Sequence, residues 1–121
     1  MMRRLPATFY GAILLSLGLA GCARHPEVTV RNLAGVALRE VVISGNGFEE
    51  KLGDIAPGGS AGSAVRLRGA SGLRVAFEAE GKRHLAAEAG YFEGSGLYRV
   101  TATVAADFSV AVEAGIGPGG F

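Results

Sequence analysis

Two carboxylates on one predicted strand are the first residues whose spacing could do chemistry. Glu78 and Glu80 stand two positions apart in the alternating stretch of residues 73–80, so both face one side, about 7 Å apart. Carboxyl pairs near that separation can hydrolyse a glycosidic bond. A solvated strand face with Arg74 as counter-charge gives the same pattern, and no sequence feature marks a cleft there. The sequence therefore favours a structural role, and we predict no catalytic residue.

A histidine is the second candidate for chemistry. His84 is the only histidine inside the expected fold, because His25 precedes it. An imidazole can act as a base or bind a metal, but a tetrahedral site needs further His or Cys ligands, which are missing there. Ser71 or Ser95 could serve it as a nucleophile, yet neither lies in a nucleophile-elbow pattern. We therefore expect His84 on the surface, and no metal or other cofactor.

Two adjacent aromatic residues are the best candidates for a binding surface. Tyr91 and Phe92 lie between glycines in residues 88–96, which we predict to be a loop. Both side chains cannot point inward from an extended chain, so one could close the end of the core while the other is displayed to a partner. Alternatively, both pack as a lid over the core. In the displayed arrangement, Glu88 and Glu93 would form an acidic rim.

The chain begins with the features of an export signal. Arg3 and Arg4 supply a positive start, and residues 9–20 form an apolar run with small residues mixed in. Twelve helical residues reach only about 18 Å, which is short of a hydrocarbon core of roughly 30 Å. We therefore expect a signal peptide at residues 1–21 rather than a stable transmembrane helix.

The motif Leu19-Ala20-Gly21-Cys22 resembles the lipobox of bacterial lipoproteins. The resemblance implies cleavage between Gly21 and Cys22 and a covalent diacylglyceryl group on the Cys22 sulfur, with no other cofactor. Cys22 is the only cysteine, so the mature chain would hold no disulfide. In that family an Asp after the cysteine favours the inner membrane. Ala23 stands there instead, which implies an anchor on the periplasmic face of the outer membrane, with surface display as an open alternative.

Cleavage would leave 100 of the 121 residues, enough for one small domain. Arg3 and Arg4 leave with the signal, so ten basic and eleven acidic residues remain and the net charge is −1. A near-neutral chain argues against nucleic-acid binding and against electrostatic docking on anionic lipid. No Gly-Lys-Ser/Thr phosphate loop occurs, so nucleotide binding has no support.

Short alternating stretches separated by turn residues dominate the mature chain and predict strands. The expected strands are residues 28–32, 38–44, 48–52, 64–68, 73–80, 83–87, 97–104 and 108–113. This spacing predicts an antiparallel β-sandwich of seven to eight strands, immunoglobulin-like or fibronectin-like, with a small closed β-barrel as the alternative. Residues 22–27 would be a short tether, residues 28–113 the sandwich, and residues 114–121 a flexible, glycine-rich tail.

Residues 45–60, centred on Leu52-Gly53-Asp54-Ile55-Ala56-Pro57-Gly58, resemble a turn region of small bacterial envelope proteins with immunoglobulin-like domains. The mature chain as a whole is similar to small proteobacterial lipoproteins. These resemblances imply a fold and no activity. We therefore predict a non-enzymatic, membrane-anchored periplasmic lipoprotein that is a binding or structural module of the envelope. The alternative is an inhibitor or pilot lipoprotein that acts on one envelope protein.

The expected partners are the membrane, through acyl chains on Cys22, and another envelope protein. Two surfaces could bind that protein. One is the loop with Tyr91 and Phe92, and the other is an exposed edge strand. Residues 83–87, a weak and hydrophilic predicted strand, are one candidate edge.

Overall fold

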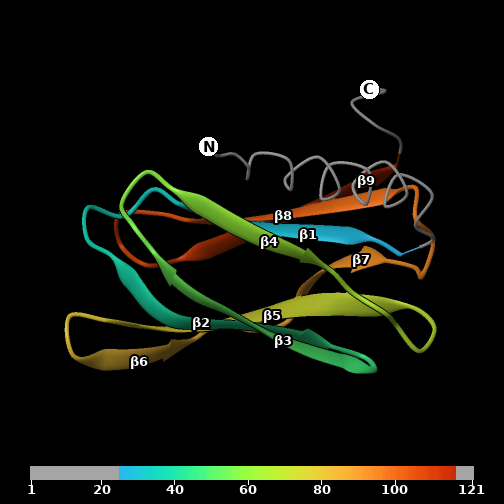
Figure 1. The fold of residues 1–121 in the computed structure, drawn as a ribbon, viewed down its shortest axis with the longest axis horizontal. Coiled ribbons are helices and arrows are strands. Elements are labelled where there is room, and N and C mark those ends of the chain that lie inside the picture. The colour runs from blue at the N-terminus through green and yellow to red at the C-terminus, as the bar shows by residue number, and fades with distance from the viewer. Residues whose placement is uncertain (1–24, 117–121) are drawn as a thin grey trace, which may run out of the picture.

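A computed structural model of the chain describes residues 25–116, which form nine strands and no helix (Figure 1). The expected signal peptide, the lipobox-like motif with Cys22, and residues 117–121 lie outside the described residues. The strands are β1 (Glu27–Asn32), β2 (Leu38–Gly45), β3 (Phe48–Ile55), β4 (Ser60–Ala64), β5 (Ser71–Ala79), β6 (Lys82–Leu85), β7 (Ala89–Phe92), β8 (Tyr98–Val104) and β9 (Val110–Ile116).

The strands form two sheets that face each other, so the predicted β-sandwich is confirmed and the closed barrel is not (Figure 1). One sheet has the order β4-β1-β8-β9, and the other has the order β3-β2-β5-β6 with β7 also paired to β5. The strand count is nine, because the stretch predicted as a loop around Tyr91 contains β7. All neighbouring strands are antiparallel except β1 and β8, which pair in parallel.

Alternation along the strands places one face of each sheet in a common core. Leu73, Val75, Phe77 and Ala79 of β5 are all at most 1% exposed, as the sequence predicts. Burying large apolar side chains stabilises the fold by roughly 1.5–3 kcal/mol each. The largest fully buried side chains are Phe77, Phe92, Leu38, Ile43, Leu73, Val28, Val30, Val41, Val65, Val75, Val100 and Val104.

Several strand boundaries differ from the prediction, and for β4 and β9 the reason is that pairing, not local pattern, sets them. β4 is Ser60–Ala64 rather than residues 64–68; its small residues carry no apolar period, but they pair with β1 in full register. A Cβ on Gly62 would come within 2.6 Å of the Val28 carbonyl oxygen, so this close pairing requires glycine. β9 continues to Ile116, past the predicted end at residue 113, because Ile116 pairs with Tyr98.

A β-bulge interrupts β2 beside both of its neighbours. Leu38 and Val41 are both buried although they are three positions apart, which a regular strand cannot achieve. The extra residue is Glu40, whose φ is 49°, and its backbone N–H donates to Asp54 Oδ1 at 2.9 Å. The bulge therefore keeps both apolar side chains inside the sandwich.

A buried asparagine joins the two sheets at the end of β1. The Asn32 side chain donates to the carbonyl oxygens of Val36 (2.9 Å) and Ile55 (3.0 Å), and it accepts from the Ala34 N–H (2.9 Å). Its backbone N–H donates to the Gly59 carbonyl oxygen at 2.9 Å. The side chain is fully buried and every side-chain hydrogen-bonding group has a partner.

We predict that Asn32→Ala strongly destabilises the fold. The change leaves two carbonyl groups and one N–H without their partner, and each buried unsatisfied group costs about 1–3 kcal/mol. Urea unfolding of residues 23–121 should show a loss of about 3 kcal/mol or more. Arg31→Ala, at the exposed neighbouring position, should change stability by at most about 0.5 kcal/mol. Equal losses for the two variants would contradict this account of Asn32.

Candidate functional site

Strand β7 separates the two aromatic residues that the sequence singled out. Phe92 is fully buried, with its ring centroid 6.4 Å from that of Phe48, whereas Tyr91 is 59% exposed. The predicted loop is wrong here, because Phe92 pairs with Ser71 of β5 and thereby makes Ala89–Phe92 a strand. One aromatic ring closes the core and the other is displayed, so a lid made of both is excluded.

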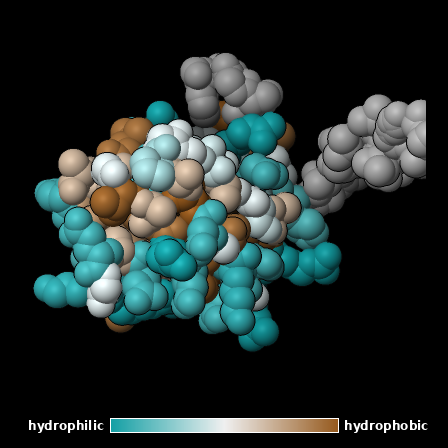
Figure 2. All heavy atoms as spheres, turned by 60° about the vertical axis from the view of Figure 1, so that its left-hand side comes forward, coloured by the Kyte–Doolittle hydropathy of each residue, from teal (hydrophilic) through white to brown (hydrophobic). Residues whose placement is uncertain are grey.

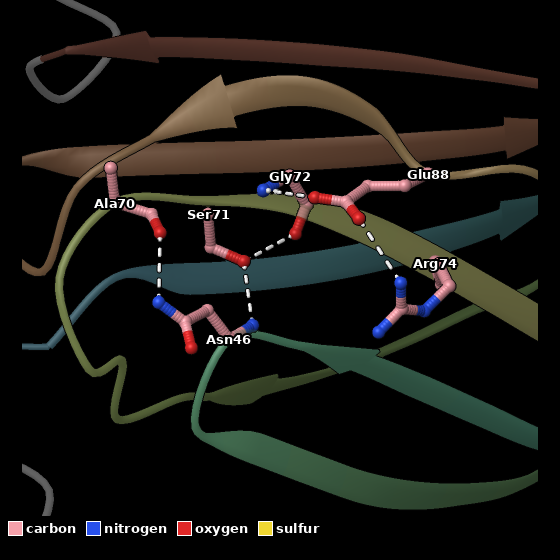
Figure 3. Close-up of polar contacts among 6 residues, drawn as sticks. All are labelled: Asn46, Ala70, Ser71, Gly72, Arg74 and Glu88. Atoms are coloured by element: carbon pink, nitrogen blue, oxygen red, sulfur yellow. Dashed lines mark hydrogen bonds and ion pairs between the residues drawn. The ribbon is translucent and has the colours of Figure 1, made fainter.

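The residue before β7 is fixed by polar contacts to β5 (Figure 3). Glu88 accepts a hydrogen bond from the Gly72 N–H and one from Arg74 Nη1, both at 3.0 Å. A Cβ on Gly72 would lie 2.7 Å from Glu88 Cγ, so no larger residue fits there without displacing the carboxylate. Glu88 therefore contributes no acidic rim around Tyr91. Its partner Arg74 was expected to balance Glu78 and Glu80 instead.

The start of β5 is joined to the β2–β3 hairpin by a serine and an asparagine (Figure 3). The Asn46 N–H donates to Ser71 Oγ at 2.9 Å, and Ser71 Oγ–H donates to the Gly72 carbonyl oxygen at 2.6 Å. Asn46 Nδ2 also reaches the carbonyl oxygens of Arg68 (2.7 Å) and Ala70 (3.2 Å). The Ser71 hydroxyl thus holds the loop before β5 in place and is no nucleophile for His84.

Tyr91 belongs to a group of exposed apolar side chains at one end of the sandwich. We call Tyr91, Leu97 and Ile116 the tether-end patch; they are 59%, 60% and 48% exposed. β7, the start of β8 and the end of β9 lie together at this end, where β1 also begins (Figure 1). The registers place Tyr98 beside Ile116 and Glu27 beside Arg99. The patch is thus at the end where β1 begins, which is where the expected tether would join the sandwich.

Tyr91 carries a neutral phenol over a wide pH range. Its hydroxyl donates to Glu93 Oε2 at 2.6 Å, and this hydrogen bond is the main cause that raises the Tyr91 pKa above its ordinary value of 10.0. The resulting stabilisation of the fold is present below pH 10 and is lost as the pH rises through the raised pKa. The patch therefore presents an uncharged ring.

The carboxylate pair is not arranged as an acid–base site. Glu80 is outside β5 and forms a two-residue turn with Gly81, both with positive φ (53° and 78°). Glu78 stays in β5 and lies opposite Arg39 of β2 and Arg83 of β6. The expected separation of the two carboxylates requires that both residues lie in one strand. Only Glu78 does so.

His84 is half-buried, so the expected surface position is wrong. Its ring stacks on Phe77 (centroids 5.0 Å apart, 12° between planes) and also contacts Phe108 (4.8 Å). Phe108 reaches this position from the β8–β9 turn with a φ of 68°. His84 Nε2 is buried and has no hydrogen-bond partner among the described residues. The histidine thus packs between aromatic rings, and its buried Nε2 forms no hydrogen bond with a serine among residues 25–116.

A groove of about 380 Å³ beside the bulge of β2 was not anticipated from the sequence. Hydrophilic side chains gather over the lower part of the molecule in Figure 2, which is turned so that the left-hand side of Figure 1 comes forward. Arg83 Nη1 donates to the Glu40 carbonyl oxygen at 3.3 Å across the groove. The sequence did carry one signal for the bulge, because Leu38 and Val41 are apolar but three positions apart, which breaks the two-residue period of a regular strand. The lining residues are Glu40, Val41, Val42, Lys51, Gly53 and Arg83.

Within residues 25–116, no three His, Cys, Asp or Glu side chains gather as metal ligands would. In the same range, no helix is long and apolar enough to cross a membrane.

The comparisons with known proteins bear on the fold alone. No model of a protein family matches the chain, and no curated protein matches it. Among solved structures, the chain is similar to an NMR structure of a protein from Eubacterium rectale. The two are 15% identical, with a TM-score of 0.55, and align over 78% of this chain and 91% of that one. This likeness supports the sandwich architecture.

We predict that Gly90→Ala destabilises the fold more than Gly81→Ala. Both glycines have nearly the same φ (79° and 78°), so an alanine at either position introduces about 1–2 kcal/mol of backbone strain. Only at Gly90 would the new Cβ meet another atom, Val112 Cγ1 at 2.7 Å. Urea unfolding should therefore show about 1 kcal/mol or more of additional loss for Gly90→Ala.

Combining Gly90→Ala with Val112→Ala provides the control. Removing the Val112 methyl groups abolishes the clash, so the double variant should lose less stability than the two single variants added together. Strict additivity would show that β7 does not pack against β9 as described.

Proposed function

We propose that this chain is an acyl-anchored, non-enzymatic β-sandwich on the periplasmic face of the outer membrane, where it binds a component of the envelope. The lipobox-like motif ending at Cys22 motivates the anchor. The observation that carries the proposal is the tether-end patch, because Tyr91, Leu97 and Ile116 are displayed where the sandwich begins, five residues after Cys22. Exposed large apolar side chains that gather in one place are typical of interaction surfaces.

The positions of the polar candidates support binding rather than catalysis. Glu80 occupies a turn, His84 packs between Phe77 and Phe108, and the Ser71 hydroxyl is engaged with Asn46 and Gly72. Nucleophilic catalysis needs the nucleophile and its base within hydrogen-bond reach of each other. Neither serine candidate forms such a bond with His84.

An inhibitor or pilot lipoprotein is the second candidate, and the exposed edge strand β6 favours it. β6 ends the order β3-β2-β5-β6, so one side of its backbone is available for pairing with another chain. Leu85 at its end is 76% exposed, the most exposed large apolar side chain among residues 25–116. An extended segment of an envelope protein could pair with this edge and cover Leu85.

We predict that Cys22→Ser abolishes lipid attachment and membrane retention. Metabolic labelling with a fatty-acid analogue should mark the wild-type protein and not the variant. Mass spectrometry should find the mature wild-type chain beginning at acylated Cys22. Ala23→Ser, at the neighbouring position, is the matched control and should be labelled like wild type. A mature wild-type chain that begins elsewhere, or is unlabelled, would overturn the anchor.

The second candidate predicts a specific protein adduct at β6. A photoreactive residue at position 85, activated in intact cells, should yield one dominant crosslink to an envelope protein. The matched control is position 33, because Leu33 is also apolar and 51% exposed but lies outside the sheet edges. The same weak adducts at both positions would remove the edge strand as a partner site.

A further inference from the structure

We propose that the tether end of the sandwich docks directly on the lipid surface, with Tyr91, Leu97 and Ile116 entering the interface between headgroups and hydrocarbon. This inference rests on the proposed acylation of Cys22 and identifies the component that the tether-end patch binds. It also fixes the orientation of the domain, with the turns between β1 and β2 and between β3 and β4 directed away from the membrane.

The length of the tether forces this end to the membrane. His25, where the described chain begins, is three positions after Cys22, and a fully extended chain covers only about 10 Å over three positions. Pro26 follows at once and is already part of the fold, since its carbonyl oxygen accepts from the Val65 N–H at 3.0 Å. A headgroup layer is itself roughly 5–8 Å thick. An acylated Cys22 therefore brings the start of β1 into or against the headgroups.

The side chains at this end have the chemistry of an interface. Tyr91 combines an apolar ring with a hydroxyl that stays hydrogen-bonded to Glu93, and tyrosine is enriched where membranes meet water. Leu97 and Ile116 are the other large apolar side chains exposed at this end. The three residues come from β7, the loop before β8 and the end of β9, so only the folded sandwich brings them together (Figure 1).

The charges at this end are of both signs, and the expected mature chain has a net charge of −1. Arg66 and Arg68 lie on the loop between β4 and β5, which contacts the tether at Pro26 and the hairpin at Asn46. Both arginines are exposed, as is Arg99, which pairs with Glu27 at the start of β8. Basic side chains near a membrane surface are attracted to anionic headgroups, but the exposed carboxylates of Glu27 and Glu93 lie at the same end. The docking therefore depends on the apolar patch and the short tether rather than on charge.

The opposite end of the sandwich provides an internal comparison. Leu33 follows β1 and is 51% exposed, similar to Ile116. The length of β1, from Glu27 to Asn32, separates it from the tether end by roughly 17 Å. If the tether end docks, Leu33 must stay in water, well beyond the headgroup layer.

The experiment uses the intact acylated protein in vesicles of phosphatidylethanolamine and phosphatidylglycerol. Because Cys22 is the only cysteine and its sulfur is acylated, Leu97→Cys introduces the only free thiol, which takes a fluorescent label. Nitroxide-bearing lipids should quench this label several-fold more strongly than a label on Leu33→Cys. Ile116→Cys is a second position, in case a label at position 97 disturbs the fold, and it should match Leu97→Cys.

The possible failures are distinguishable. If the unlabelled protein does not float with the vesicles, the acyl anchor fails and the proposed function fails with the docking. If the protein floats but the labels at positions 33, 97 and 116 are quenched equally, the anchor stands and the docking is overturned. A photoreactive residue at position 97 in intact cells should give lipid adducts. One dominant protein adduct would show instead that a protein occupies the tether-end patch.

Discussion

The described fold depends on one buried amide. Asn32 lies at the end of β1 in one sheet and donates to the Ile55 carbonyl oxygen at the end of β3 in the other. Its remaining side-chain bonds hold the turn at Ala34 and Val36, and its backbone holds the turn before β4. A fully satisfied polar group in a low-dielectric interior fixes geometry more strictly than apolar packing does. One residue thus sets the spacing of the sheets at the end distant from the tether.

The tether end is fixed by a different set of polar contacts, and these determine what the molecule displays. Ser71 joins the start of β5 to the hairpin at Asn46, and Glu88 binds Gly72 and Arg74 just before β7. With its start held in this way, β7 alternates so that Phe92 enters the core and Tyr91 faces outward. The surface proposed to meet lipid is thus a consequence of how β7 is held against β5.

Sequence patterns predicted the strands that carry their own apolar period and missed those that do not. The alternation of residues 73–79 gave β5 directly, because its side chains face the core in turn. β4 has only Ser, Ala and Gly, and it is a strand because the edge of β1 pairs with it. His84 was misplaced for a similar reason: its hairpin partner Phe77 stacks on one side of the ring, but the Phe108 ring that covers it comes from the distant β8–β9 turn.

The amino-acid sequence by itself determined the two-faced strands, the positions of most turns and the lipobox-like motif at Cys22, because each of these is a local pattern. Tertiary structure alone decided the partners of each strand, including the parallel pair of β1 and β8. It also decided that the end of β7, the start of β8 and the end of β9, and with them Tyr91, Leu97 and Ile116, lie at the end of the sandwich where β1 begins. Their convergence depends on the registers of β7, β8 and β9, which long-range pairing sets and local periodicity does not encode.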